Sequence, residues 1–160
     1  MNSPDCTATK EVPMLNNSVT LHRVFVSSPD KIYKAFLDPD ALPKFLPPNG
    51  FTGKVHSLDA KVGGSYKMSF TNLGTGTGPS FGGIYTELVK NKRIVHVDKF
   101  DDVNIKGEMK TTVNITKVSV GAEVTVTQNG LPKEIPVEAC YLGWQQSLDL
   151  LALLVEANIP

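Results

Sequence analysis

The chain has 160 residues, of which 41% are hydrophobic and 20% are charged, and its 16 basic residues balance its 16 acidic ones. A chain of this length and composition can bury a core of its own and fold as one domain without disulfides or metals. The zero net charge gives no long-range attraction to nucleic acid or to an anionic membrane, and no apolar run approaches the ~20 residues that span a bilayer.

The first eighteen residues mix Ser, Thr, Asn, Pro and charged residues without periodicity. We therefore expect a loose leader over 1–18 and a single domain over 19–160. The leader lacks the basic start and the apolar stretch of a signal peptide, which favours a cytoplasmic protein. The two cysteines, Cys6 and Cys140, lie far apart and lack the Cys-x-x-Cys spacing of zinc and redox sites. The sequence predicts neither a metal nor a cofactor.

The first predicted elements are one strand and two short helices. VTLHRVFV (19–26) alternates and is rich in β-branched residues, which predicts a strand. A helix begins after it, with Ser28 as its N-cap and Pro29 in its first turn, and it ends at Asp38-Pro39. DALPKFLPP predicts a second short helix, which the two prolines at its end terminate.

Between residues 50 and 129 the hydrophobic period becomes two residues. In SYKMSF, Tyr66, Met68 and Phe70 share one face, and Met109 opens a cleaner alternation in EMKTTVNITKV. Such alternation indicates antiparallel strands with one face buried and one face in water. The six strands predicted here cover 51–58, 65–72, 82–89, 93–100, 107–118 and 122–129.

The last predicted element is a helix over roughly 137–157. Trp144, Leu148, Leu151 and Val155 recur at helical spacing, and further leucines widen this apolar stripe beyond that of an ordinary surface helix. Something large and apolar must cover such a helix, and the curved sheet is the candidate. Near the helix start, Cys140 is more simply a small buried hydrophobe than a reactive thiol. Trp144 is either a core residue or a platform on which a ligand stacks.

The glycine-rich stretch TNLGTGTGPSFGGIY (71–85) has two interpretations, a phosphate-binding loop or the tip of a hairpin. It lacks the Gly-Lys-Ser/Thr ending of a Walker loop and the Gly-x-Gly-x-x-Gly spacing of a dinucleotide fingerprint. The strand-like GIYTELV follows it, so there is no helix N-terminus to receive a phosphate. We predict a mobile hairpin loop over 72–81 that is indifferent to nucleotides, with Phe81 available as a lid over a cavity mouth.

Four stretches together resemble a known family: RVFVSSPDKIYKAFLDPDALPKFLPPNGF, LDAKVGGSYKMSF, GGIYTELVKNKRIVHVDKF and GLPKEIPVEACYLGWQQSLDLLALLVE. They are similar to the activator-of-Hsp90-ATPase-like branch of the Bet v 1/START-related superfamily, over about residues 19–157. The resemblance implies an α+β helix-grip fold. In that fold a curved antiparallel sheet of about seven strands wraps around a long C-terminal helix, and two short helices follow the first strand.

The same resemblance implies an elongated hydrophobic cavity between the sheet and the last helix. Members of the superfamily mostly bind ligands, and some are polyketide cyclase-like enzymes. The eukaryotic namesakes stimulate the Hsp90 chaperone with a domain of this kind. The resemblance therefore implies that this chain encloses a hydrophobic cavity. The family has no single catalytic motif that could be transferred to it.

Strand alternation predicts which polar side chains enter the cavity. His96 and Asp98 share a face of RIVHVDKF, and Tyr85 and Glu87 share a face of GGIYTELV. A histidine, a tyrosine and two carboxylates in an apolar space are candidates for acid–base chemistry, because desolvation and pairing shift their pKa values. Alternatively, these groups pair with one another or lie near the rim in water.

The short KNKR turn joins these two strands, so we expect them to pair as a hairpin. Residue numbers across the ladder then sum to about 182, which sets Glu87 beside His96 or its neighbour and Tyr85 beside Asp98 or its neighbour. We hypothesise that a Glu87–His96 pair orients a polar group of an otherwise hydrophobic ligand. A one-residue slip of the register would turn these side chains outward.

Three classes of function fit the sequence. An unbroken apolar cavity would favour a protein that binds a hydrophobic or aromatic small molecule. A His–carboxylate hydrogen bond inside a closed cavity would favour a cyclase- or hydrolase-like enzyme. A filled interior with a large exposed apolar patch would favour an interaction module with a protein partner, chaperone-related or a second copy of the chain. The residues predicted to contact a ligand are Tyr66, Met68, Phe70, Phe81, Tyr85, Glu87, His96, Asp98, Phe100, Met109, Trp144, Leu148 and Leu151.

Overall fold

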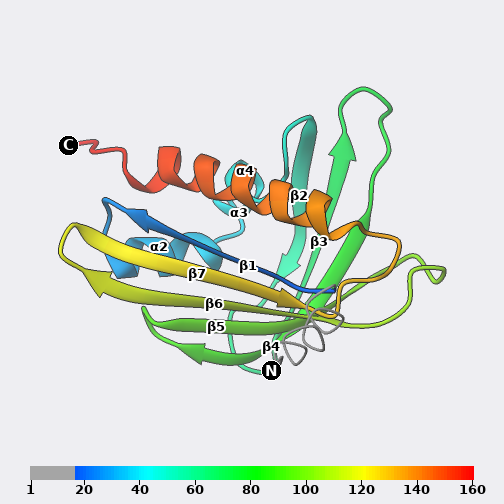
Figure 1. The fold of residues 1–160 in the computed structure, drawn as a ribbon, viewed down its shortest axis with the longest axis horizontal. Coiled ribbons are helices and arrows are strands. Elements are labelled where there is room, and N and C mark those ends of the chain that lie inside the picture. Colours follow the sequence, from blue (N-terminus) through cyan, green and yellow to red (C-terminus); the bar gives the residue numbers. More distant parts are fainter. Residues whose placement is uncertain (1–16) are drawn as a thin grey trace, which may run out of the picture.

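The computed structural model describes residues 17–160, which form an antiparallel sheet, two short helices and one long helix (Figure 1). Cys6 and almost all of the predicted leader over 1–18 lie outside the described residues. The strands are β1 (Val19–Phe25), β2 (Phe51–Leu58), β3 (Ser65–Asn72), β4 (Ser80–Val89), β5 (Arg93–Phe100), β6 (Met109–Val118) and β7 (Gly121–Asn129). The helices are α2 (Pro29–Phe36), α3 (Leu42–Phe45) and α4 (Val137–Val155).

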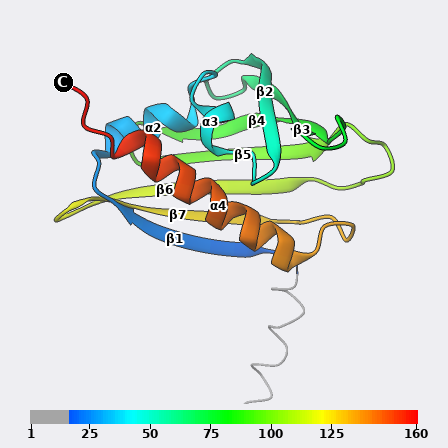
Figure 2. The ribbon, with the colours of Figure 1, turned by 90° about the horizontal axis from the view of Figure 1, so that it is seen from above.

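The seven strands form one sheet in the order β1-β7-β6-β5-β4-β3-β2. Strands β2 to β7 follow one another as antiparallel hairpins. Strand β1 instead pairs with β7, with Val19 opposite Gln128 and Phe25 opposite Ala122. The sheet is curled, and α4 runs across its concave face (Figure 1, Figure 2). This architecture confirms the predicted α+β fold, a curved sheet around a long C-terminal helix.

Alternating burial shows why the strands form where the sequence pattern indicates. In β1, Val19, Leu21 and Phe25 are buried and exposed residues lie between them. Two strand boundaries differ from the prediction by two residues, since β4 begins at Ser80 and β6 begins at Met109, and the end of β1 and the start of β7 each differ by one. Strand β4 begins early because Phe81 pairs with β3 on one side and with β5 on the other. The hairpin loop before it is correspondingly shorter than predicted.

The helix after β1 begins where the sequence predicts. Ser28 holds the N-cap position with an extended backbone, although its side chain makes no capping hydrogen bond, and Pro29 starts the first turn. Helix α2 then buries Ile32 and Phe36 under the sheet. The Phe36 ring contacts Phe45 of α3 edge-to-face, with centroids 5.2 Å apart. This ring pair joins the two short helices within the core.

Helix α4 is fixed to the rest of the domain by packing and by hydrogen bonds. Leu151 is fully buried (0% exposed), and Met68 and Val113 are also buried. The Ser147 hydroxyl donates a hydrogen bond to the carbonyl oxygen of Leu46 at 2.7 Å. At the other end of the helix, the backbone N–H of Val26 donates to a Glu156 carboxylate oxygen at 2.9 Å.

The glycine-rich stretch forms the hairpin connection between β3 and β4, as the sequence predicts. The N–H of Asn72 donates to the carbonyl oxygen of Thr77 at 2.7 Å, which closes the loop. Gly76 has a φ of +77°, a value that disfavours other residues. A Cβ at Gly78 would lie 2.0 Å from the carbonyl oxygen of Phe70. These two glycines therefore serve the backbone path of the hairpin.

Candidate ligand-binding cavity

A cavity of about 330 Å³ lies between the sheet and the first half of α4. Ligand pockets commonly measure roughly 300–1,000 Å³, so this one has room for a small organic molecule. Protein interiors are otherwise packed about as densely as organic crystals, so space of this size is a specific feature of the molecule. Ten of the residues that the sequence predicts line it: Tyr66, Met68, Phe70, Phe81, Tyr85, His96, Asp98, Phe100, Met109 and Trp144.

Aromatic rings form much of the wall on the β3–β5 side. The Phe81 ring lies 5.0 Å from Phe70, 6.0 Å from Phe100 and 6.5 Å from Tyr66, measured between centroids. These rings meet edge-to-face, an arrangement that aromatic side chains prefer. Phe81 is held in β4 as part of this wall, whereas the sequence suggested a residue of the loop.

Two of the predicted contact residues, Leu148 and Leu151, do not line the cavity. Both are buried in the hydrophobic core. The cavity ends at Ser147 along α4, and the helix after that residue packs directly on its neighbours. The helical period identifies the buried face correctly, but it carries no information on which turns of that face border empty space.

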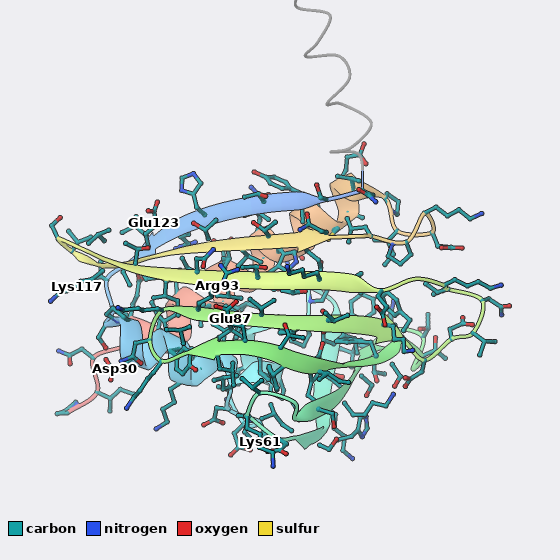
Figure 3. All side chains as sticks on the ribbon, turned by 90° about the horizontal axis from the view of Figure 1, so that it is seen from below. Asp30, Lys61, Glu87, Arg93, Lys117 and Glu123 are labelled. Atoms are coloured by element: carbon teal, nitrogen blue, oxygen red, sulfur yellow. The ribbon has the colours of Figure 1, made fainter. Side chains whose placement is uncertain are left out.

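The prediction for Glu87 is wrong, and a β-bulge is the reason. Tyr85 pairs with His96, but the next pair is Glu87 with Val95, so Thr86 is an extra residue on β4. The bulge turns Glu87 to the outer face of the sheet, where its side chain is 48% exposed (Figure 3). There its carboxylate accepts a hydrogen bond from Arg93 Nε at 3.1 Å.

The expected Glu87–His96 and Tyr85–Asp98 pairs are therefore absent from the ladder. Asp98 lies opposite Gly83, two residues before Tyr85, and Tyr85 lies opposite His96. His96 and Asp98 do face the cavity, as the sequence predicts. Instead of Glu87, the partner of His96 is the carboxylate two residues along its own strand.

Asp98 is the centre of a buried polar cluster. Its side chain is 3% exposed and receives three hydrogen bonds, from the Tyr66 hydroxyl at 2.5 Å, His96 Nδ1 at 2.5 Å and the Thr111 hydroxyl at 2.9 Å. An ionised carboxylate only accepts hydrogen bonds, so three converging donors suit the charged form. Such partners offset the cost of removing a charge from water.

Gly83 makes room for this carboxylate. A Cβ at Gly83 would lie 2.5 Å from Asp98 Oδ1 and 2.4 Å from the carbonyl oxygen of Val97. Both distances are well below van der Waals contact, so a side chain here would displace the carboxylate or separate the strands. The absence of a side chain at Gly83 thus allows Asp98 to lie flat against β4 beneath the Tyr66 hydroxyl.

A second group of polar residues connects the cluster to α4, and sequence reasoning missed its central residue, Gln128. Gln128 Nε2 donates to the Thr111 hydroxyl at 3.1 Å. Its Oε1 accepts from Trp144 Nε1 at 3.0 Å and from the Cys140 thiol at 3.3 Å. The hydrogen bond to Gln128 fixes the orientation of the Trp144 ring in the cavity wall. In the sequence, Gln128 and Thr111 could have been recognised as polar residues on the inward face of a strand.

Three ionisable groups in the cavity wall, Tyr66, Tyr85 and Cys140, have pKa values shifted toward their neutral forms. Burial raises the pKa of Tyr66 well above its usual value, and the negative charge of Asp98 raises it further. The pKa of Tyr85 is also raised, mainly by burial and to a smaller extent by the Asp98 charge. Burial raises the pKa of the Cys140 thiol to about 11. Both phenols therefore keep their protons near neutral pH, and the thiol is not activated.

The sequence match agrees with this architecture. The family model described as activator of Hsp90 ATPase homolog 1-like protein matches residues 27–156. The chain belongs to this family. No curated protein shows significant sequence similarity to it. The match covers α2 to α4 and therefore includes every element that lines the cavity.

Solved structures similar to this family member come from several bacteria. A crystal structure of a protein from Chromobacterium violaceum is 51% identical, with a TM-score of 0.87, and the alignment covers 89% of this chain and 99% of that one. A Rhodobacter sphaeroides protein is 18% identical with a TM-score of 0.78, covering 91% and 96%. An Arthrobacter aurescens protein is 15% identical with a TM-score of 0.79, covering 89% and 88%. The last two show a shared fold alone.

The described residues contain neither a metal-binding group of side chains nor a membrane-spanning helix. Among residues 17–160, no three His, Cys, Asp or Glu side chains are grouped so that they could hold a metal ion. The described helices include none that is both long and apolar enough to cross a bilayer.

Proposed function

We propose that this protein binds a hydrophobic small molecule in the cavity between the sheet and α4. The supporting observation is an internal space of about 330 Å³ whose wall is mainly aromatic and aliphatic, with one polar cluster. Burying apolar surface is worth roughly 25 cal/mol per Å², so an apolar molecule gains free energy by leaving water for this space. A few fixed polar groups in an otherwise apolar pocket are typical of sites that also orient their ligand.

Native mass spectrometry of the protein purified from its own host tests the proposal directly. We expect a mass above that of the chain alone, and release of a small apolar compound on denaturation. Binding of N-phenyl-1-naphthylamine, a neutral dye whose fluorescence rises in apolar sites, provides a second assay.

A pair of α4 variants makes the dye assay specific for the cavity. Gly143 lines the cavity, and a Cβ there meets only a Pro48 carbon at 3.9 Å, so Gly143→Phe fills the space. Leu142→Phe is the matched control, because Leu142 is exposed on the outer side of the same helix. We expect Gly143→Phe to abolish dye binding and Leu142→Phe to retain it. Equal dye binding by both variants would place the dye elsewhere and count against a ligand cavity.

One observation favours a second candidate function, an acid–base enzyme of the cyclase or hydrolase kind. His96 Nδ1 lies 2.5 Å from the buried Asp98 carboxylate, and His96 faces the cavity. A carboxylate that fixes the orientation of a histidine is a common feature of general acid–base sites. Hydrolysis of 4-nitrophenyl esters that His96→Asn abolishes and Leu142→Phe retains would support this alternative.

The interaction-module hypothesis predicted a filled interior, and the cavity does not match that expectation. The family description names the Hsp90 ATPase, so a protein partner has a direct test. Stimulation of an Hsp90 ATPase by the purified chain, with Gly143→Phe as active as the unmodified protein, would favour the interaction module over ligand binding.

A further inference from the structure

The hydrogen bonds around Asp98 determine which nitrogen of His96 is free. The Asp98 carboxylate already accepts from the Tyr66 and Thr111 hydroxyls, so it acts as the acceptor for His96 as well. Neutral histidine carries one N–H, and this contact places it on Nδ1. The other nitrogen, Nε2, is then a hydrogen-bond acceptor. Among residues 17–160, nothing donates a hydrogen bond to it.

The Tyr85 hydroxyl is the second free polar group in the same part of the wall. Tyr85 is only 3% exposed and lines the cavity, yet its hydroxyl makes no hydrogen bond within the described part of the chain. It lies directly across the ladder from His96, and the two rings meet edge-to-face with centroids 5.7 Å apart. Its raised pKa keeps it protonated, so it can donate.

The cavity thus presents a neighbouring donor and acceptor, neither of which has a hydrogen-bond partner among residues 17–160. A hydroxyl can bond to both, because it accepts one hydrogen bond and donates another. We propose that the ligand is an apolar molecule bearing an alcohol or phenol, whose hydroxyl accepts from Tyr85 and donates to His96 Nε2. This inference rests on the proposed binding function and names the class of ligand for that site.

Charge argues against an anionic group at the same position. Among the described residues, no lysine or arginine lines the cavity, and the Asp98 carboxylate lies 2.5 Å from His96 Nδ1. A carboxylate at this point would add a second negative charge to an apolar space without a cation to pair with it, which is costly. A neutral hydroxyl adds no charge. Asp98 itself is a positioning residue here, because its own hydrogen bonds are already made inside the protein.

Three bicyclic probes of similar shape test the proposal by calorimetric titration: 2-naphthol, 2-methoxynaphthalene and 2-methylnaphthalene. The first both donates and accepts, the second only accepts, and the third does neither. We expect the protein to bind 2-naphthol about tenfold more tightly than 2-methylnaphthalene, which lacks both hydrogen bonds, and about threefold more tightly than 2-methoxynaphthalene, which lacks one, because each hydrogen bond is worth about 0.5–1.5 kcal/mol, or roughly two- to twelvefold. The 2-naphthoate anion should bind more weakly than 2-naphthol.

Three variants test which side chains cause the preference for 2-naphthol. Tyr85→Phe removes the free hydroxyl, and His96→Asn keeps a donor toward Asp98 while removing Nε2. Each should reduce the preference for 2-naphthol over 2-methylnaphthalene to about threefold or less, since one hydrogen bond then remains, and only His96→Asn should also remove the preference over 2-methoxynaphthalene. In the matched variant Tyr66→Phe, the lost hydroxyl is the one committed to Asp98. Tyr66→Phe can change the affinity for all three probes, but the ratio of their affinities should stay the same.

The possible outcomes separate this inference from the function on which it rests. If none of the probes binds, the proposed ligand cavity fails, and the inference fails with it. If the three neutral probes bind with equal affinity, the cavity stands and the hydroxyl site is refuted. Binding of 2-methoxynaphthalene as tight as that of 2-naphthol would show that Nε2 is not an acceptor. Tight binding of 2-naphthoate would overturn the neutral class of ligand.

Discussion

Two tyrosines in the cavity wall should differ sharply in their contribution to stability. The Tyr66 hydroxyl donates to the buried Asp98 carboxylate at 2.5 Å, whereas the Tyr85 hydroxyl has no partner in the described part of the chain. A hydrogen bond to a charged group contributes about 1.5–3 kcal/mol, and removing the donor leaves part of a buried charge uncompensated. We expect Tyr66→Phe to lower the free energy of unfolding by about 2–3 kcal/mol, and Tyr85→Phe to change it by less than about 0.5 kcal/mol.

Urea denaturation followed by fluorescence measures this difference, because Trp144 is the single tryptophan of the chain and lies in the same wall. The slope of the free energy with urea concentration should be the same in both variants, so that the midpoint alone reports stability. Thr111→Val supplies a further check, since Thr111 donates to the same carboxylate. Its effect and that of Tyr66→Phe should not add, because both act on Asp98. Equal losses in Tyr66→Phe and Tyr85→Phe would refute the role assigned to Asp98.

Three more perturbations have defined outcomes. Leu151→Ala should lower the free energy of unfolding by about 2–5 kcal/mol, as expected for a fully buried leucine, and a change below about half a kcal/mol in chemical denaturation would show that α4 is not held by the sheet. Gly83→Ala should cost at least about 1–3 kcal/mol, because its Cβ would overlap Val97 and Asp98, and calorimetric melting that matches the unmodified protein would contradict this. Stability should fall as the pH rises from about 9 to about 11, because the Cys140 thiol ionises near 9.0 when unfolded and near 11 when folded, so the unfolded state loses its proton first. Cys140→Ala should reduce, without abolishing, the dependence of the urea midpoint on pH across this window, because the raised pKa values of Tyr66 and Tyr85 contribute to the same dependence, and an unchanged slope would argue against a buried thiol.

The fold was predictable because burial follows the strand period. In β1 and β3 one face holds the buried residues, so apolar and polar residues alternate and the strand can be recognised from the sequence alone. The first residues of β4 and β6 were less predictable. Residues such as Phe81 belong to the strand because of the partners across the ladder, and those partners are distant in sequence.

The candidate site was predictable up to the point where alternation breaks. His96, Asp98 and Tyr85 were assigned to the cavity side from the period alone, and the structure places them there. The bulge at Thr86 reverses the assignment of Glu87, and neither glycine nor proline in the sequence marks it. Gln128 was missed because its role depends on contacts with Thr111 on the next strand and with α4.

The pairing of β1 with β7 has a consequence for how the chain is made. Strand β1 emerges from the ribosome first, yet its partner lies about a hundred residues later, because Val19 pairs with Gln128. At a synthesis rate of about 5–20 residues per second, the apolar face of β1 waits roughly 5–20 s for the strand that completes the sheet. Contacts of such long sequence separation also slow folding. Leu21 and Phe25 therefore remain without their native cover until nearly the whole domain has been translated, and the risk of aggregation falls in that interval.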